Sequence, residues 1–355
     1  MSTVLAPPAP SPERTGLRRR ALPGWAVPAF ALAAVGLSLL LAAVRGTGGL
    51  VPIAVVSYLL FVLGLVGASA FVEGGRRARD RLATALVGGA FGTALAPLLA
   101  VLGVVVSRGL ERFDLDFFTH SMRGVGPTDR GGGAYHAIVA TLEQVGLASA
   151  FAVPVGILVA IYLVEYGRGT FATVTSYVID VMTGLPSVVA GLFVLAFFIL
   201  YLQHGRGFSG FAGAIALSLL MLPIVVRSTE EMLKLVPDAL REASYALGVP
   251  RYRTILRIVL PTALPGIVTG VMLGVARIFG ETAPILLVTF GTDSINLDPF
   301  HGAQSSLPLF VFQQASQPNV TAIDRAWTGA LTLILIVMVL NIVARLVARR
   351  AGVRR

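Results

Sequence analysis

The stretch Val236–Pro261 reads VPDALREASYALGVPRYRTILRIVLP and is the longest charged interruption with helical spacing in an otherwise apolar chain. Pro237 suits the first turn of a helix, where a missing N–H costs nothing. Gly248, followed by Val249 and Pro250, is a typical signal for the end of that helix. We therefore predict a helix of about three turns between Pro237 and Gly248. A second amphipathic piece, Arg251–Leu260, is expected to end at the final proline.

The predicted helix has two different faces. One carries small and apolar residues at positions i, i+3, i+4 and i+7, which are Leu240, Ala243, Ser244 and Leu247. The other repeats the same spacing with polar and aromatic residues, which are Asp238, Arg241, Glu242 and Tyr245. Because residues at this spacing share one side of a helix, we expect the first face to pack on the protein and the second to meet a partner.

Composition places the chain in a membrane. Of its 355 residues, 55% are hydrophobic and only 13% are charged, whereas soluble domains carry roughly a quarter charged residues. The net charge of +10 comes mostly from arginines beside apolar runs, which indicates membrane topology rather than nucleic-acid binding. The chain has no cysteine and its four histidines lack ligand spacing, so we predict neither a metal site nor catalytic residues.

Hydropathy predicts an all-α polytopic membrane protein with about eight transmembrane helices. The expected spans cover residues 25–44, 50–72, 82–106, 136–164, 174–202, 211–226, 263–290 and 326–347. The fifth span is expected to break at Gly184–Ser187, and the seventh to be long and interrupted. We expect residues 1–24 to form a disordered cytoplasmic tail. Residues 25–81 would then add two transmembrane helices in front of a six-helix core that occupies residues 82–350.

Positive charge orients these spans. An even number of crossings puts both termini on one side, and the segments assigned to that side carry 20 of the 28 basic residues. Cytoplasmic loops collect arginine and lysine. Both tails and the stretch 236–261 are therefore predicted to be cytoplasmic.

Ionisable residues inside a bilayer are costly, which makes them candidates for function. Arg277 and Glu281 lie one helical turn apart in the seventh span, and the forked guanidinium matches phosphate oxygens. We predict that this pair lines or gates an anion path; the alternative is a structural ion pair at a subunit interface. Glu143 and Asp180 are expected to be hydrogen-bond partners in helix packing rather than members of a proton relay.

Two further features are candidates for the same path. Arg227 and Glu230 stand at i, i+3 near the cytoplasmic end of the sixth span, where an ordinary membrane anchor is the alternative. Pro186 and Ser187 belong to the break of the fifth span. A broken helix frees backbone groups that must face protein, water or ligand, so the break is a plausible element of a pathway.

Positions within the opening stretch match a known signature at every spacing. Glu242-Ala243-Ser244, Gly248, Ile258 and Leu260-Pro261 follow the pattern E-A-A-x3-G-x9-I-x-L-P, with serine in place of the second alanine. The stretch thus resembles the EAA segment of the permease subunits of binding-protein-dependent ABC importers. The resemblance implies that residues 228–261 form a cytoplasmic coupling segment whose helix docks in a groove of an ATPase subunit. The residues expected to make this coupling are Asp238, Arg241, Glu242, Ala243, Tyr245 and Gly248.

Four more blocks resemble phosphate-importer permeases of the PstA type. They are AIYLVEYG at 160–167, LPSVVAGLF at 185–193, LPIVVRSTE at 222–230 and RIFGETAP at 277–284. The resemblance covers roughly residues 82–350 and implies a type I ABC importer permease domain there. The two leading spans depart from the family pattern, and the resemblance implies nothing about their role.

The resemblance also implies a function and a set of partners. The chain would be the permease subunit that forms half of the path of an ATP-driven phosphate importer in a bacterial plasma membrane. Its partners would be membrane lipid, a second permease of the PstC type, a PstB-type ATPase dimer and an extracytoplasmic phosphate-binding protein.

ATP and magnesium would belong to the ATPase, because the single lysine, Lys234, does not stand in a G-x4-G-K-[ST] phosphate cradle. We therefore expect no cofactor in this chain and no enzymatic activity of its own. The alternatives are a permease for another oxyanion or solute and, less in keeping with the EAA segment, a channel or secondary transporter.

Overall fold

The computed structural model describes residues 21–46, 49–126, 128–205 and 207–352. Most of the predicted tail, residues 1–20, lies outside this part of the chain. No strand is present among the described residues, whose only β-type pairing is an isolated bridge between Phe290 and Gln304. The predicted all-α class is confirmed.

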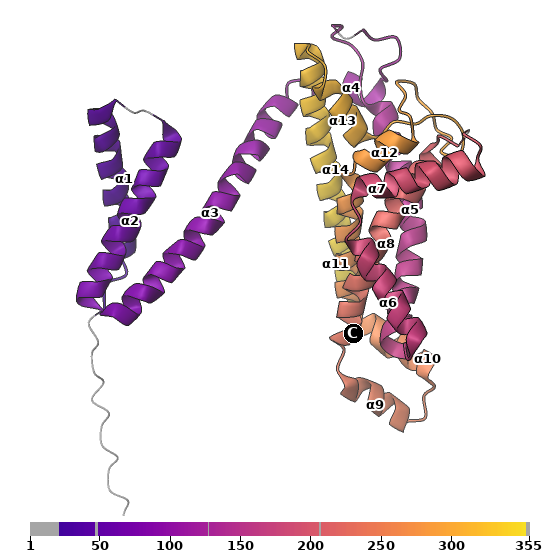
Figure 1. Cartoon of the computed structure of the whole chain (residues 1–355), viewed down its shortest axis with the longest axis horizontal. Coiled ribbons are helices and arrows are strands. Elements are labelled where there is room, and N and C mark those ends of the chain that lie inside the picture. The colour runs from indigo at the N-terminus through magenta and orange to yellow at the C-terminus, as the bar shows by residue number, and fades with distance from the viewer. Residues whose placement is uncertain (1–20, 47–48, 127, 206, 353–355) are drawn as a thin grey trace, which may run out of the picture. The chain divides into compact units, whose positions relative to one another are not determined.

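The chain divides into two compact units, residues 1–101 and 102–355. The first unit contains α1 (Ala26–Arg45), α2 (Leu50–Val72) and the larger part of α3 (Gly75–Gly109), as Figure 1 shows. The Tyr58 hydroxyl on α2 donates a 2.7 Å hydrogen bond to the Ala85 carbonyl on α3. This unit therefore takes in most of a third helix beside the two that the sequence places ahead of the core.

The second unit contains the remaining helices, three of which include or continue into π-helical turns. They are α4 (Leu115–Thr119), α5 (Tyr135–Ile161) with η1 (Tyr162–Tyr166), α6 (Thr170–Thr183), α7 (Ser187–Phe193) with η2 (Val194–Leu202), α8 (Gly210–Lys234), α9 (Asp238–Ala246), α10 (Arg251–Thr254) with η3 (Ile255–Val259), α11 (Leu260–Phe279), α12 (Ala283–Val288), α13 (Leu307–Ala315) and α14 (Val320–Gly352). The short α4 and α13 were not predicted.

Seven of the helical segments described are long and apolar enough to cross a membrane, and the pair α6 and α7–η2, bent by 111°, makes an eighth segment if it is counted as one span. The packing favours that count. Gln144 near the start of α5 lies against Gly213 near the start of α8, and Gly156 farther along α5 lies against Val225 farther along α8. Since α5 and α8 are therefore parallel, the bent pair between them must return the chain to the opposite end of the unit.

Helix α8 is the centre of the second unit. Of the 18 most apolar consecutive residues of α8, 67% are buried. Its inner face packs with α5, α11 and α12 in one hydrophobic core. On α11, a Cβ added to Gly266 or Gly270 would lie 2.2 Å from Met232 Sδ or 2.4 Å from Ser228 Oγ. Small residues thus let these two helices approach closely, as is common in membrane proteins.

One predicted boundary is wrong. The helix that starts at Arg251 does not end at Pro261 but continues through η3 into α11, as one helical segment of 29 residues. The π-helical turn ends at Val259, two residues before Pro261, and such a turn relaxes the i→i−4 hydrogen bonding to which proline cannot donate. The predicted interruption of the seventh span is present at Gly280–Thr282, between α11 and α12.

Candidate functional site

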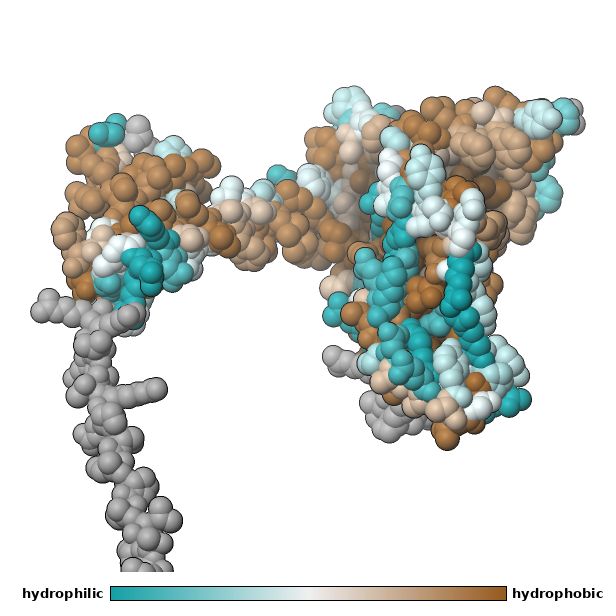
Figure 2. All heavy atoms as spheres, turned by 60° about the horizontal axis from the view of Figure 1, so that its bottom comes forward, coloured by the Kyte–Doolittle hydropathy of each residue, from teal (hydrophilic) through white to brown (hydrophobic). Residues whose placement is uncertain are grey.

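Helix α9 lies at the end of the second unit where α5 and α8 finish (Figure 1). It starts after Pro237 and stops before Gly248, whose φ of 75° is the left-handed conformation that glycine adopts without strain. Both predicted ends of this helix are therefore confirmed. Figure 2 shows hydrophilic residues gathered over this end of the unit, whereas its flanks are largely hydrophobic.

Arg241 fastens α9 to the membrane helices. Its guanidinium donates to Glu165 Oε1 at 3.0 and 3.1 Å, and to the carbonyls of Val236 at 2.6 Å and Leu233 at 2.9 Å. The side chains of Arg241 and Glu165 are only 12% and 4% exposed. A buried ion pair whose remaining donors are also satisfied holds a defined geometry, and it is costly to break from one side.

Two more contacts complete this attachment. The Ser244 and Thr254 hydroxyls share a 2.8 Å hydrogen bond that joins α9 to α10, and both residues are buried. The Arg251 guanidinium donates to the Glu165 carbonyl and lies 4.9 Å from the centre of the Tyr166 ring. Glu165 therefore receives α9 through its carboxylate and α10 through its carbonyl.

The predicted orientation of α9 is wrong in part. Arg241 was expected on the partner-facing side but points into the protein. Conversely, Leu240, Ala243 and Leu247 were expected inside but are exposed, Leu240 by 41% and Leu247 by 83%. The physical reason is that Arg241 finds a buried carboxylate and two free carbonyls at the helix base, a better match than an apolar side chain would make there. The exposed residues of α9 and its stop are Asp238, Ala239, Leu240, Glu242, Ala243, Tyr245, Ala246, Leu247 and Gly248.

Arg227 and Glu230 lie in a charged cluster between α6 and α8. Arg227 donates to Glu230 at 2.5 Å, to the Ser176 hydroxyl at 2.9 Å and to the Asp180 carboxylate. Lys234 adds a 2.7 Å hydrogen bond to Glu230. The guanidinium is thus engaged by both helices, and the predicted packing role of Asp180 is confirmed by this contact.

Arg277 and Glu281 form a looser pair at the end of α11. The Arg277 Nε and Glu281 Oε1 atoms are 3.8 Å apart, and the arginine side chain is 59% exposed. Since Gly266 and Gly270 face Met232 and Ser228 of the antiparallel α8, Arg277 is offset from Arg227 by about 9 Å along the helix axis, and no hydrogen bond or ion pair between the described residues joins them. The structure does not bring the two predicted pairs together.

Pro186 and Ser187 form the corner at which the bent pair turns. Pro186 caps α7 with a ψ of 138°, and α6 ends at Thr183, three residues after Asp180. The corner therefore lies six residues after Asp180, the residue of α6 that contacts Arg227. Pro186 is exposed and Ser187 is partly exposed, so neither is sealed in the core.

Sequence reasoning missed Glu165 and Ser176 as members of these clusters. Glu165 stands at the end of an apolar run, where a charge is usually interfacial, and Ser176 is one of several hydroxyls on α6. Their partners Arg241 and Arg227 are 76 and 51 positions away in the chain. The one available signal was the AIYLVEYG block that contains Glu165.

A family model described as "Binding-protein-dependent transport system inner membrane component" matches residues 152–353, which include α9 and both charged pairs. The bacterial alginate ABC transporter contains a chain of similar fold, with a TM-score of 0.58 at 16% identity over 77% of this chain and 96% of that one. This likeness concerns the fold alone.

Curated relatives match more of the sequence. The chain is 49% identical to "Phosphate transport system permease protein PstA 1" of Mycobacterium tuberculosis strain CDC 1551 over 79% of its own length and 92% of the relative's. It is 40% identical to "Phosphate transport system permease protein PstA" of Yersinia pestis over 77% and 90% of the two lengths. The chain therefore belongs to the family of inner membrane components of binding-protein-dependent transport systems and, within that family, to the PstA-type permeases.

Proposed function

We propose that this chain is the membrane permease subunit of an ATP-driven phosphate importer, in which it forms half of the translocation path. The observation that carries the proposal is the 49% identity to a phosphate transport system permease over 79% of the chain. A permease for another oxyanion is the remaining alternative, because the named substrate belongs to the relatives. The channel and secondary-transporter alternatives are not favoured by the family.

The exposed side of α9 is proposed as the contact with an ATPase subunit. Leu240, Tyr245 and Leu247 are exposed apolar or aromatic groups at a helix that lies outside the apolar spans, and Asp238 and Glu242 flank them. Exposed apolar groups with a charged rim are typical of a protein interface. In this proposal Arg241 is a positioning residue, which transmits movement of α9 to η1 and α8 through Glu165 and the Leu233 carbonyl.

The two charged pairs are proposed to have different roles. The side chain of Arg277 is 59% exposed, so it is the better candidate to meet a phosphate oxygen. Arg227 is already engaged by Glu230, Ser176 and Asp180, which favours a role in holding α6 and the Pro186–Ser187 corner against α8. Movement of α9 would then reach the corner through the end of α8.

The proposed assembly contains a second permease of the PstC type, a PstB-type ATPase dimer that binds ATP and magnesium, and an extracytoplasmic phosphate-binding protein. Eight crossings and the placement of 20 of the 28 basic residues support cytoplasmic amino and carboxyl termini and a cytoplasmic α9. Specificity would lie largely with the binding protein, which first selects the anion.

Substrate stimulation of ATP hydrolysis tests the proposal. The complex reconstituted with its binding protein is expected to hydrolyse ATP faster with phosphate than with sulfate or molybdate at equal concentration. Equal or greater stimulation by sulfate or molybdate would contradict the phosphate assignment and leave the permease assignment intact. With assembly checked, Arg277→Gln should lower uptake roughly tenfold or more, the value of one hydrogen bond to a charged group; normal uptake would exclude Arg277 from the path.

Coupling is tested by co-purification with the ATPase. Leu247→Asp should abolish recovery of the ATPase with the permease, because it places a carboxylate in the proposed interface while disturbing no packing at an 83% exposed position. Leu115→Asp is the matched control, since this leucine is 78% exposed on α4 at the opposite end of the unit (Figure 1). Full recovery with Leu247→Asp, or equal loss with Leu115→Asp, would contradict the proposed contact.

A further inference from the structure

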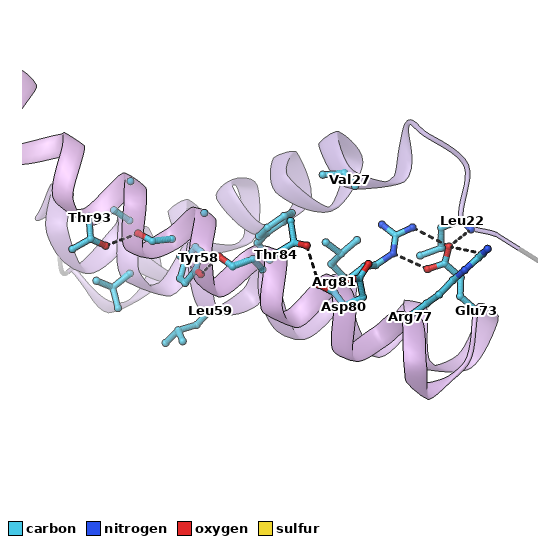
Figure 3. A pocket seen from close by; sticks show the side chains of 18 of the residues that line it. Leu22, Val27, Tyr58, Leu59, Glu73, Arg77, Asp80, Arg81, Thr84 and Thr93 are labelled. Carbon is cyan, nitrogen blue, oxygen red and sulfur yellow. Dashed lines mark hydrogen bonds and ion pairs between the residues drawn. The ribbon is translucent and has the colours of Figure 1, made fainter. Parts of the chain in front are cut away.

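A long cavity runs between α1, α2 and α3 in the first unit. Its volume is about 1040 Å³, at the upper end of the roughly 300–1,000 Å³ range of small-molecule sites. Its walls are mostly apolar, and Val27, Leu59, Gly88 and Gly92 are among the residues that line it. Figure 3 shows charged side chains at one end of the cavity and Tyr58, Leu59 and Thr93 toward the other.

The charged end is built around Glu73, whose side chain is only 2% exposed. Its carboxylate accepts hydrogen bonds from Arg81 at 2.6 and 2.9 Å, from the Ser69 hydroxyl at 2.7 Å and from the Leu22 amide at 2.8 Å. The Arg81 hydrogen bond, followed by that of Ser69, lowers the pKa of Glu73 to about 2. The carboxylate is therefore ionised and fully engaged within the protein.

Guanidinium donors remain at this end after that pairing. The charged residues that line it are Arg77, Arg81, Glu73 and Asp80. Arg81 gives Glu73 two of its N–H groups, out of the five that a guanidinium carries. Arg77 lies 3.8 Å from Glu73 and is 43% exposed, so it also reaches the mouth of the cavity. An anion placed there would meet forked donors on two adjacent turns of α3.

The helices around the apolar part of the cavity are largely exposed in the described chain. In the most apolar 18-residue stretches of α1, α2 and α3, only 11%, 11% and 6% of the residues are buried. A Cβ added to Gly88 or Gly92 would have no atom within 4 Å. Helices this exposed have lipid as their solvent, and a groove floored by glycine admits a chain that an ordinary side chain would exclude.

We propose that this cavity binds an anionic phospholipid, whose acyl chain lies along the apolar walls and whose phosphate lies at Arg77 and Arg81. A guanidinium matches phosphate oxygens in geometry and charge, and basic pockets between membrane helices are a recurrent site for acidic headgroups. Both ends of the cavity thus match the two ends of one molecule. The site lies outside the transport function proposed above and does not depend on it.

Lipid retention by the intact importer complex tests this site. The complex is equilibrated with vesicles of equal phosphatidylglycerol and phosphatidylcholine, and retained lipids are counted by native mass spectrometry. Phosphatidylglycerol should be retained in preference. Arg77→Gln should lower this preference roughly tenfold or more, the value of one hydrogen bond to a charged group. Arg79→Gln is the control, because Arg79 is exposed on the same helix but does not line the cavity.

A second variant tests occupancy by filling the groove. Gly88→Leu with Gly92→Leu should remove most of the retained phosphatidylglycerol, whereas Gly67→Leu on α2, also in open space but outside the lining, should not. The proposal is overturned if both arginine variants reduce the preference equally, which would indicate general surface attraction, or if filling leaves retention unchanged. It is also overturned if filling releases a partner subunit without loss of lipid, because the groove would then hold a protein helix.

Discussion

Helices α3 and α8 have similar mean hydropathy, but only 6% of the most apolar 18 residues of α3 are buried, against 67% of those of α8. Hydropathy therefore identifies a span but not its neighbours. The buried helix carries the Arg227 cluster and positions α9, whereas the exposed helix leaves Gly88 and Gly92 facing open space. Protein packing builds the proposed machinery in the second unit, and lipid is left to complete the first.

The buried ion pairs also differ between the two units. In the second unit, Glu165 and Arg241 join segments 76 positions apart and fix a helix outside the spans. In the first unit, Glu73 and Arg81 are eight positions apart and close a local turn between α2 and α3. We expect perturbations of the second unit to be larger, and the following experiments compare the two.

The largest effect is expected for Arg241→Ala. It leaves the carboxylate of Glu165, which is 4% exposed, buried without its partner, which costs about 3–5 kcal/mol. The measurements are the thermal stability of the purified complex and its ATP-dependent uptake, both of which should fall. Asp238→Ala is the control for thermal stability, since this 87% exposed carboxylate contacts the same guanidinium and should contribute about 0–1 kcal/mol. Equal losses of thermal stability in the two variants would show that Glu165 is not the important partner.

Next in size is Gly191→Ala on α7. The new Cβ would lie 2.8 Å from Pro284 Cα of α12, a backbone atom that cannot rotate away, so we expect destabilisation of about 1–3 kcal/mol. Gly92→Ala on α3 meets nothing within 4 Å and should leave stability unchanged or raise it by up to about 1 kcal/mol through helix propensity. Thermal unfolding of the two variants in one detergent checks the difference. Similar melting temperatures would contradict the contrast in packing.

A smaller effect is expected for Asp180→Asn. The side chain of Asp180 is 63% exposed, and Arg227 keeps Glu230 and Ser176 as partners, so the loss is about 0.2–1 kcal/mol. Initial rates of phosphate uptake should fall by up to roughly fivefold, because α6 is held less firmly against α8. Asp116→Asn on α4, where the side chain is 76% exposed, should have no effect. An unchanged rate in Asp180→Asn would remove this contact from the mechanism.

The smallest effect concerns pH and the first unit. The pKa of Glu73 falls from 4.5 to about 2 on folding, mainly through the Arg81 hydrogen bond, so the stabilisation is complete above pH 4.5 and is lost as the pH falls toward 2. Deuterium exchange of the Leu22 amide, which donates to Glu73, should lose protection only in that range. Glu73→Gln should weaken the protection of the Leu22 amide at neutral pH and remove its pH dependence between pH 4.5 and about 2. If the Leu22 amide remains equally protected in Glu73→Gln, other contacts hold this residue and the predicted role of Glu73 is wrong.

Much of the fold could be predicted from local patterns. Apolar runs identified the spans, the Gly184–Ser187 break and the interruption after Phe279, because each depends on consecutive residues. Pro237 and Gly248 identified the ends of α9 for the same reason. The predicted end at Pro261 was wrong, since a π-helical turn accommodates a proline that would otherwise stop the helix.

The site could be predicted less well. Its residues were named correctly as charged positions near spans, but the orientation of α9 failed at Arg241, where helical spacing assigned a long basic side chain to the outside. Glu165 and Ser176 could not be identified as partners, because their ion pairs and hydrogen bonds join positions far apart in the chain.

The sequence alone determined that the chain crosses a membrane repeatedly, where α9 begins and ends, and that its EAA-type spacing resembles an importer permease. These properties follow from local composition and spacing. Tertiary structure alone decided that Arg241 turns inward, that Arg227 joins α6 to α8, that Arg277 stays apart from it, and that the first unit retains an open cavity. Those features depend on which helices meet, and burial of a charge is favourable only where the fold supplies its partner.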